Sequence, residues 1–171
     1  MSTFNPEQFL STETTELGET KYTPVPEGEW AAQVQKVDVK AITSKKSGDE
    51  FTVLEVTWNI PDERVKTSTG LDEPTVRQSI FLDLKANGAL DFGRNKNVPL
   101  SRLREAVGQQ REGRPWALSH LIGSQAIVLV KHRLDDNGDP QADVSKVVGI
   151  GAARGREETP APTSSRGRSR A

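Results

Sequence analysis

The chain has no cysteine among its 171 residues, one tyrosine and two histidines. The lack of cysteine excludes disulfide bonds, thiolate metal sites and thiol nucleophiles. No apolar run reaches the roughly 18 residues of a membrane-spanning helix. The first ten residues also lack the basic and apolar regions of a secretory signal. We therefore expect a protein that makes no contact with a membrane, and a location in the cytoplasm is consistent with this composition but not required by it.

Catalytic and metal-binding patterns are missing as well. His120 and His132 are twelve residues apart, and no carboxylate spacing accompanies them. The acidic residues at 135, 136 and 139 lack the spacing of a calcium loop, and the glycines at 149–155 miss the dinucleotide fingerprint by one residue. We predict a protein that is not an enzyme and that has no cofactor and no metal site.

The net charge of −1 hides an uneven distribution. Residues 1–29 carry six acidic residues and one lysine, whereas residues 152–171 carry five arginines and two glutamates. The second segment is otherwise Pro, Ser, Thr, Gly and Ala, a composition that cannot build a core. We therefore predict an acidic, extended N-terminal arm at 1–29, one domain at 30–151 and a disordered basic tail at 152–171. The body is near neutral and lacks the strongly basic character of many nucleic-acid-binding domains.

The order of the patterned segments predicts the fold. Three strand-like runs precede a helix that is bracketed by Pro99 and Gly108, and two strand-like runs follow it. This β-β-β-α-β-β order is that of an oligonucleotide/oligosaccharide-binding (OB) barrel, an all-β fold with one helix. The strand-like runs are 30–40, 51–60, 76–84, 126–134 and 142–150, and the helical run is 98–107.

Local signals refine this prediction. The alternation in the first strand changes phase near Gln35 and Lys36, which predicts a β-bulge. Hairpin loops are expected at 44–49 and at 136–139, and 61–74 reads as a long loop. Asn5 and Pro6 favour a short helix in the arm, and 116–122 favours one further helical turn.

Two phenylalanines fall on the outward faces of neighbouring strands. In the second and third strands, Phe51 and Phe81 have the opposite parity to the apolar core positions. Binding of single-stranded nucleic acid needs aromatic faces for base stacking and cations that follow the phosphates. The candidate stacking residues are Phe51 and Phe81, and the candidate phosphate contacts are Lys45, Lys46, Arg77, Lys131 and Arg133.

Four short stretches resemble a family of small bacteriophage early proteins. They are PVPEGEW at 24–30, KKSGDEF at 45–51, LSRLREAVG at 100–108 and LIG at 121–123. The resemblance covers residues 22–150 and implies an OB-like barrel that coats single-stranded DNA in phage replication or recombination. It also implies a location in the cytoplasm of the infected bacterial host. Many single-strand-binding proteins end in an acidic tail, whereas this chain ends basic and begins acidic.

These observations predict a non-enzymatic protein that binds single-stranded DNA largely independently of sequence. Two alternatives remain open: a structural role in the phage particle, as a decoration or tail protein, and an adaptor that binds a replication or recombination protein. The sequence also leaves open whether the chain forms a homo-oligomer.

Overall fold

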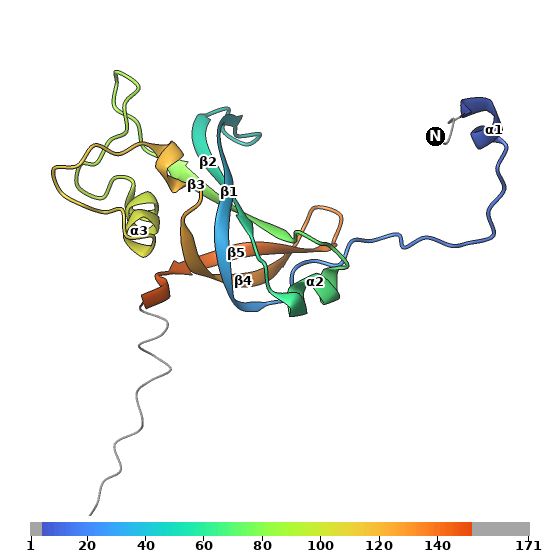
Figure 1. Ribbon diagram of the computed structural model, residues 1–171. Helices are drawn as coiled ribbons and strands as arrows, with labels where there is room; N and C mark the ends of the chain where they lie inside the picture. Colours follow the sequence, from blue (N-terminus) through green and yellow to red (C-terminus); the bar gives the residue numbers. More distant parts are fainter. Residues whose placement is uncertain (1–4, 152–171) are drawn as a thin grey trace, which may run out of the picture.

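A five-stranded mixed sheet closes in a ring, so that the molecule is barrel-like (Figure 1). The structure is a computed structural model that describes residues 5–151. Around the ring the strands follow the order β1-β2-β3-β5-β4, and β4 returns to β1. The strands are β1 (Gly28–Thr43), β2 (Glu50–Asn59), β3 (Thr75–Leu82), β4 (Gln125–Leu134) and β5 (Pro140–Val148).

The ring closes through a short parallel contact between β3 and β5, at which Arg77 pairs with Asp143. The other neighbouring strands are antiparallel and have long registers. The predicted order of strands around one helix is therefore confirmed, and each strand begins and ends within a few residues of its predicted bounds. The predicted hairpin at 44–49 closes through the Ser44 N–H, which donates to the Asp49 carbonyl at 2.8 Å.

The predicted bulge in β1 is present. The register against β2 shifts between Val34 and Lys36. Val34 is buried and Val37 packs against the same core, although their spacing in an unbroken strand would place them on opposite faces. The bulge thus allows one long strand to pair with β4 in its first half and with β2 in its second half.

The core fills the inside of the ring. Trp58, Leu54 and Val128 are fully buried there, and α3 (Val98–Ala106) adds Leu100 and Leu103 from one end. The predicted helix is confirmed, and it ends one residue earlier than expected. Its C-terminus lies so close to β5 that a Cβ on Gly149 would come within 3.0 Å of the Ala106 carbonyl oxygen.

The prediction of a loop throughout 61–74 is wrong. A short helix, α2 (Glu63–Thr69), occupies part of this range. Its N-cap is Asp62, whose carboxylate accepts the Arg64 N–H at 2.9 Å, and its C-cap is Gly70 with φ = 70°. The sequence ERVKTST contains three β-branched residues and has low helix propensity, which is why its pattern gave no helix signal. Burial of Val65 supplies the stabilisation that propensity does not.

The remaining helical predictions are confirmed. The side chain of Asn5 caps α1 (Pro6–Leu10), which stands away from the sheet at the end of an extended segment (Figure 1). A 3-10 turn, η1 (Leu118–Leu121), lies within the predicted range. Within residues 5–151, no helix is long and apolar enough to cross a membrane. The predicted disordered tail at 152–171 lies outside the described residues.

The segment before β1 is fastened to the end of β4. Val25 is buried, and its carbonyl oxygen lies 2.7 Å from His132 Nε2. The backbone N–H of His132 donates to Glu27 Oε1 at 2.8 Å, and this hydrogen bond lowers the pKa of Glu27. The last residues of the predicted arm therefore belong to the folded body.

Acid should weaken the β4–β5 hairpin through Asp135. The backbone N–H of Asp139 donates to Asp135 Oδ1 and, together with that of Asn137, lowers the pKa of Asp135. A carboxylate with a lowered pKa stabilises the fold above its ordinary value of about 3.9, and this contribution is lost as the pH falls through the folded-state pKa. Asp135→Asn should therefore be less stable than the wild type in urea at pH 7, and the difference should shrink below pH ~4.

Asp136→Asn is the matched control for this prediction. Asp136 is exposed in the same turn and makes no hydrogen bond or ion pair with the described residues, so its substitution should leave the denaturation midpoint unchanged at both pH values. If the difference in stability between the wild type and Asp135→Asn stays constant with pH, the carboxylate charge does not stabilise the turn.

Candidate nucleic-acid interface

Phe51 and Phe81 meet on the outside of the ring. Their ring centroids are 5.8 Å apart with an interplanar angle of 83°, an edge-to-face pair. Phe51 remains 41% exposed and Phe81 63% exposed. Edge-to-face aromatic pairs are mutually stabilising, which holds both rings in position although much of their surface faces solvent. Both side chains therefore lie where strand parity places them.

The two phenylalanines belong to a strip of apolar side chains on the outer face of the sheet. In the strand register, Val53 lies between Lys40 of β1 and Phe81 of β3, and Ile42 lies opposite Phe51. Val53 is on the outer face yet only 3% exposed, and it is not part of the inner core. Its neighbours on the outer face cover it. We call Ile42, Phe51, Val53 and Phe81 the apolar strip.

Next to the apolar strip, the carboxylate of Glu55 forms ion pairs with two basic side chains. Lys40 Nζ lies 3.0 Å from Glu55 Oε2, and the Arg77 guanidinium lies 3.8 Å from Glu55 Oε1. The Glu55 side chain is 19% exposed, whereas those of Lys40 and Arg77 are 52% and 72% exposed. Both cations are accessible to a ligand, but part of their charge is already neutralised.

Lys45 and Lys46 lie in the β1–β2 hairpin, beyond the Phe51 end of the apolar strip. Both side chains are exposed, and neither forms an ion pair with a described residue. Free cations beside exposed aromatic rings are the combination that single-stranded nucleic acid requires.

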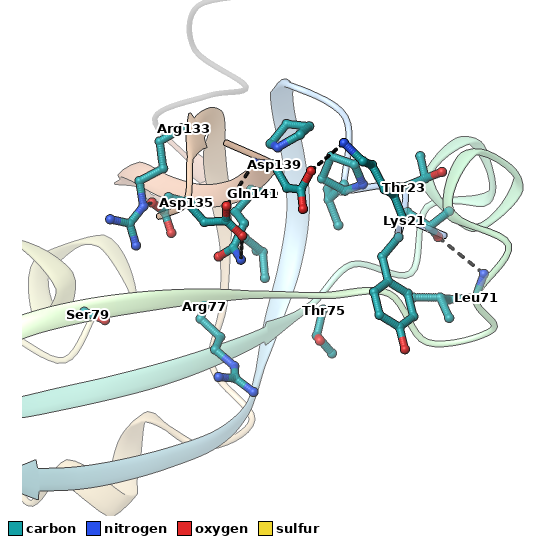
Figure 2. Close-up of a pocket in the computed structure, with 18 of the residues that line it drawn as sticks. Lys21, Thr23, Leu71, Thr75, Arg77, Ser79, Arg133, Asp135, Asp139 and Gln141 are labelled. Atoms are coloured by element: carbon teal, nitrogen blue, oxygen red, sulfur yellow. Dashed lines mark hydrogen bonds and ion pairs between the residues drawn. The ribbon is translucent and has the colours of Figure 1, made fainter. Parts of the chain in front are cut away.

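At the other end of β3, a groove of about 700 Å³ lies along the junction between β3 and the β4–β5 hairpin. Arg77 and Ser79 lie on one side and Arg133 and Gln141 on the other, while residues 20–25 border one end (Figure 2). We call this the β3–β5 groove. Ser79 lies between Arg77 and Phe81 on the outer face of β3, and four strand residues place those two about 13 Å apart.

The cations of the β3–β5 groove are paired internally. Arg133 forms an ion pair with Asp143. Lys21 forms one with Asp139 (Figure 2). Together with the Arg77–Glu55 pair, these contacts leave the groove with little free positive charge. The groove is therefore polar and mixed in charge, unlike the hairpin beside the apolar strip.

The structure brings together most, but not all, of the predicted residues. Phe51, Phe81, Lys45 and Lys46 gather at one end of β2 and β3, and Arg77 and Arg133 both line the β3–β5 groove. Lys131 lies on the outer face of β4, opposite Asp143 in register and near Glu27, and it does not line the groove.

Sequence reasoning missed three residues of this surface. Ile42, Lys40 and Glu55 join it because β1 pairs with β2 in one particular register after the bulge. Lys40 and Ile42 follow the bulge, whose change of phase places them on the outer face, and the unbroken alternation of β2 places Glu55 on the same face. Both patterns were usable signals. The pairing partner of each residue was not readable from the sequence.

Comparison with known proteins gave no match to a protein-family model and no match to a curated protein sequence.

Proposed function

We propose that this chain binds single-stranded DNA, largely independently of sequence, through the outer face of β1, β2 and β3. The observation that carries the proposal is the exposed edge-to-face pair of Phe51 and Phe81. The ring order, with α3 between β3 and β4, supports the finer assignment of the sheet as an OB barrel, a fold that binds oligonucleotides across such a face.

In this proposal the apolar strip stacks bases and the flanking cations hold phosphates. Lys45 and Lys46 contact the DNA phosphates on one side of the two phenylalanine rings, and Arg77 contacts them on the other side. Each stacked base contributes about 1–3 kcal/mol irrespective of its identity, because every base has a π-face. Lys131 and Arg133 extend the contact only if the strand continues past Arg77 towards β4.

Fluorescence anisotropy with a labelled thymine oligonucleotide of about 30 nucleotides tests the proposal, since such barrels occupy about 4–16 nucleotides each. Binding should weaken steeply with salt and should resist competition by duplex DNA. The absence of binding at low salt would overturn the proposal.

Glu55→Gln should strengthen this binding. The substitution keeps the shape of the side chain and removes the negative charge that neutralises Lys40 and Arg77. Two released cations should raise the affinity severalfold at low salt and steepen the slope of log K against log salt by about 1. Anisotropy titrations at several salt concentrations measure both quantities.

Glu29→Gln is the charge-matched control, because Glu29 is exposed on the part of β1 that pairs with β4 and forms no ion pair with a described residue. If Glu55→Gln and Glu29→Gln raise the affinity for DNA equally, the effect comes from net charge and not from the ion pairs of Glu55.

The sequence resemblance to phage early proteins supports a role of this binding in phage DNA replication or recombination. A structural role in a phage particle is the second candidate, and exposed apolar side chains before β1 favour it. Leu10 is 86% exposed and Leu17 is 99% exposed, as expected for an arm that packs on a neighbour. Sedimentation of the chain without DNA distinguishes the two, because a stable assembly that lacks affinity for DNA supports the structural role.

A further inference from the structure

The connection between β3 and β4 carries most of the unpaired positive charge of the fold. Residues 84–123 contain seven Lys or Arg residues and three Asp or Glu residues, a formal charge of +4. Within residues 5–151, none of these seven cations has a carboxylate oxygen within 4.0 Å, whereas the cations of the β3–β5 groove are paired. In Figure 1 the connection, with α3, forms a lobe at the side of the sheet.

One guanidinium in this lobe lies between two aromatic rings. The Arg104 Cζ atom lies 4.2 Å from the centroid of the Trp116 ring and 5.5 Å from that of Phe92. Its Nε atom is buried and has no hydrogen-bond partner among the described residues. The residue as a whole is half-buried, and its Nη2 atom donates to the Gln109 carbonyl at 3.5 Å. Because no carboxylate of the described residues neutralises this guanidinium, it leaves a positive potential on the Trp116 side of the lobe.

A single side chain fixes the surroundings of Trp116. Gln109 Oε1 accepts the Trp116 indole N–H at 2.8 Å, while Gln109 Nε2 donates to the His120 carbonyl at 2.8 Å and to Ser124 Oγ at 2.9 Å. The Nδ1 atom of His120 accepts the Ala117 N–H at 3.3 Å, so that Nε2 carries the proton in the neutral ring. These bonds hold the indole, the imidazole and the η1 turn in one arrangement.

A cavity of about 220 Å³ lies beside this cluster, and Arg111, Arg114, Trp116 and His120 line it. Pockets for drug-sized ligands are larger, about 300–1,000 Å³. Arg111 and Arg114 are exposed, and their guanidinium groups have no partner among the described residues. These groups are therefore available for a phosphate, whose geometry they match. We call this cavity the Trp116 pocket.

We infer that the Trp116 pocket binds a phosphate ester, with Arg111 and Arg114 on the phosphate oxygens and His120 Nε2 as a further donor. The attached sugar or base lies against Trp116, whose ring Gln109 and Arg104 hold in place. The phosphate belongs either to a mononucleotide or to the backbone of a polynucleotide. The site uses none of the residues of the apolar strip, so it stands independently of the function proposed above.

The three tryptophans make a direct test possible. Each indole N–H has a different acceptor: the Pro26 carbonyl for Trp30, Gln78 for Trp58 and Gln109 for Trp116. Their signals in a nitrogen–proton NMR spectrum of the full chain should therefore be distinct, and Trp116→Phe assigns the third. Titration with dTMP should shift the Trp116 signal saturably, while the signal of Trp58, which is buried in the core, stays fixed.

Inorganic phosphate and a thymine oligonucleotide serve as parallel probes that identify the source of the phosphate. The double variant Arg111→Ala with Arg114→Ala should bind dTMP about tenfold or more weakly than the wild type, because two charge-assisted contacts are lost. Lys45→Ala with Lys46→Ala removes the same charge from another loop and should leave the dTMP titration unchanged. The inference is overturned if none of the three probes shifts the Trp116 signal saturably, or if the arginine double variant binds as well as the wild type.

Discussion

Replacing both outer phenylalanines with alanine should abolish most single-stranded DNA binding and leave the fold intact. Phe51 and Phe81 make their edge-to-face contact on the surface, and neither ring belongs to the inner core. With about 1–3 kcal/mol lost for each stacked base, the double variant should bind the thymine oligonucleotide roughly a hundredfold more weakly. Anisotropy measures the affinity, and urea denaturation measures the free energy of unfolding.

Phe9→Ala provides the matched control. Phe9 is a similarly exposed phenylalanine, 66% exposed, in α1, which lies away from the sheet (Figure 1). Its substitution should leave the affinity for DNA within about twofold of the wild type, since it removes no stacking surface from the outer face. If the double variant unfolds, the two rings support the structure; if it folds and binds normally, base stacking does not occur at this pair.

Substitution of the buried polar residue Asn97 should cause a large loss of stability. This residue is fully buried, and its Oδ1 accepts the Asp83 N–H at 2.9 Å. Its Nδ2 donates to the carbonyls of Asp83 and Asp91 at 2.8 and 2.7 Å. Asn97→Ala leaves the half-buried Asp83 N–H and Asp91 carbonyl without these partners and removes one of the two donors to the Asp83 carbonyl, which still accepts the Asp91 N–H. The loss of three hydrogen bonds should cost about 3 kcal/mol. A lower urea midpoint with an unchanged slope would report this loss.

Asn95→Ala separates the hydrogen bonds from the backbone conformation. Asn95 and Asn97 both have a positive φ, of 61° and 49°, so that alanine is strained at either position by about 1–2 kcal/mol. Asn95 is exposed and makes no hydrogen bond through its side chain to a described residue. The difference in the free energy of unfolding between Asn97→Ala and Asn95→Ala measures the contribution of the Asn97 side-chain hydrogen bonds. Equal destabilisation would mean that these bonds contribute nothing.

Some features of this protein follow from local pattern alone. The order of strands and the helix 98–107 were predictable because a two-residue alternation and a Pro99–Gly108 bracket need no knowledge of distant residues. The bulge at Gln35–Lys36 was readable for the same reason, since a change of phase in one strand requires it. The outward direction of Phe51 and Phe81 follows directly from parity.

Other features depend on which segments meet. Glu55 neutralises Lys40 and Arg77 only because three strands align in one register, and Asn97 is buried only because the chain folds back onto Asp83 and Asp91. Helix α2 forms because Val65 is buried in the core, although ERVKTST favours no helix.

By itself, the sequence determined the order of the strands and the faces of their side chains, because both arise from interactions between residues close together in the chain. The tertiary structure alone decided which cations are free and which are neutralised. Coulomb energy falls with the distance between charges, and that distance is set by the packing of residues far apart in the sequence.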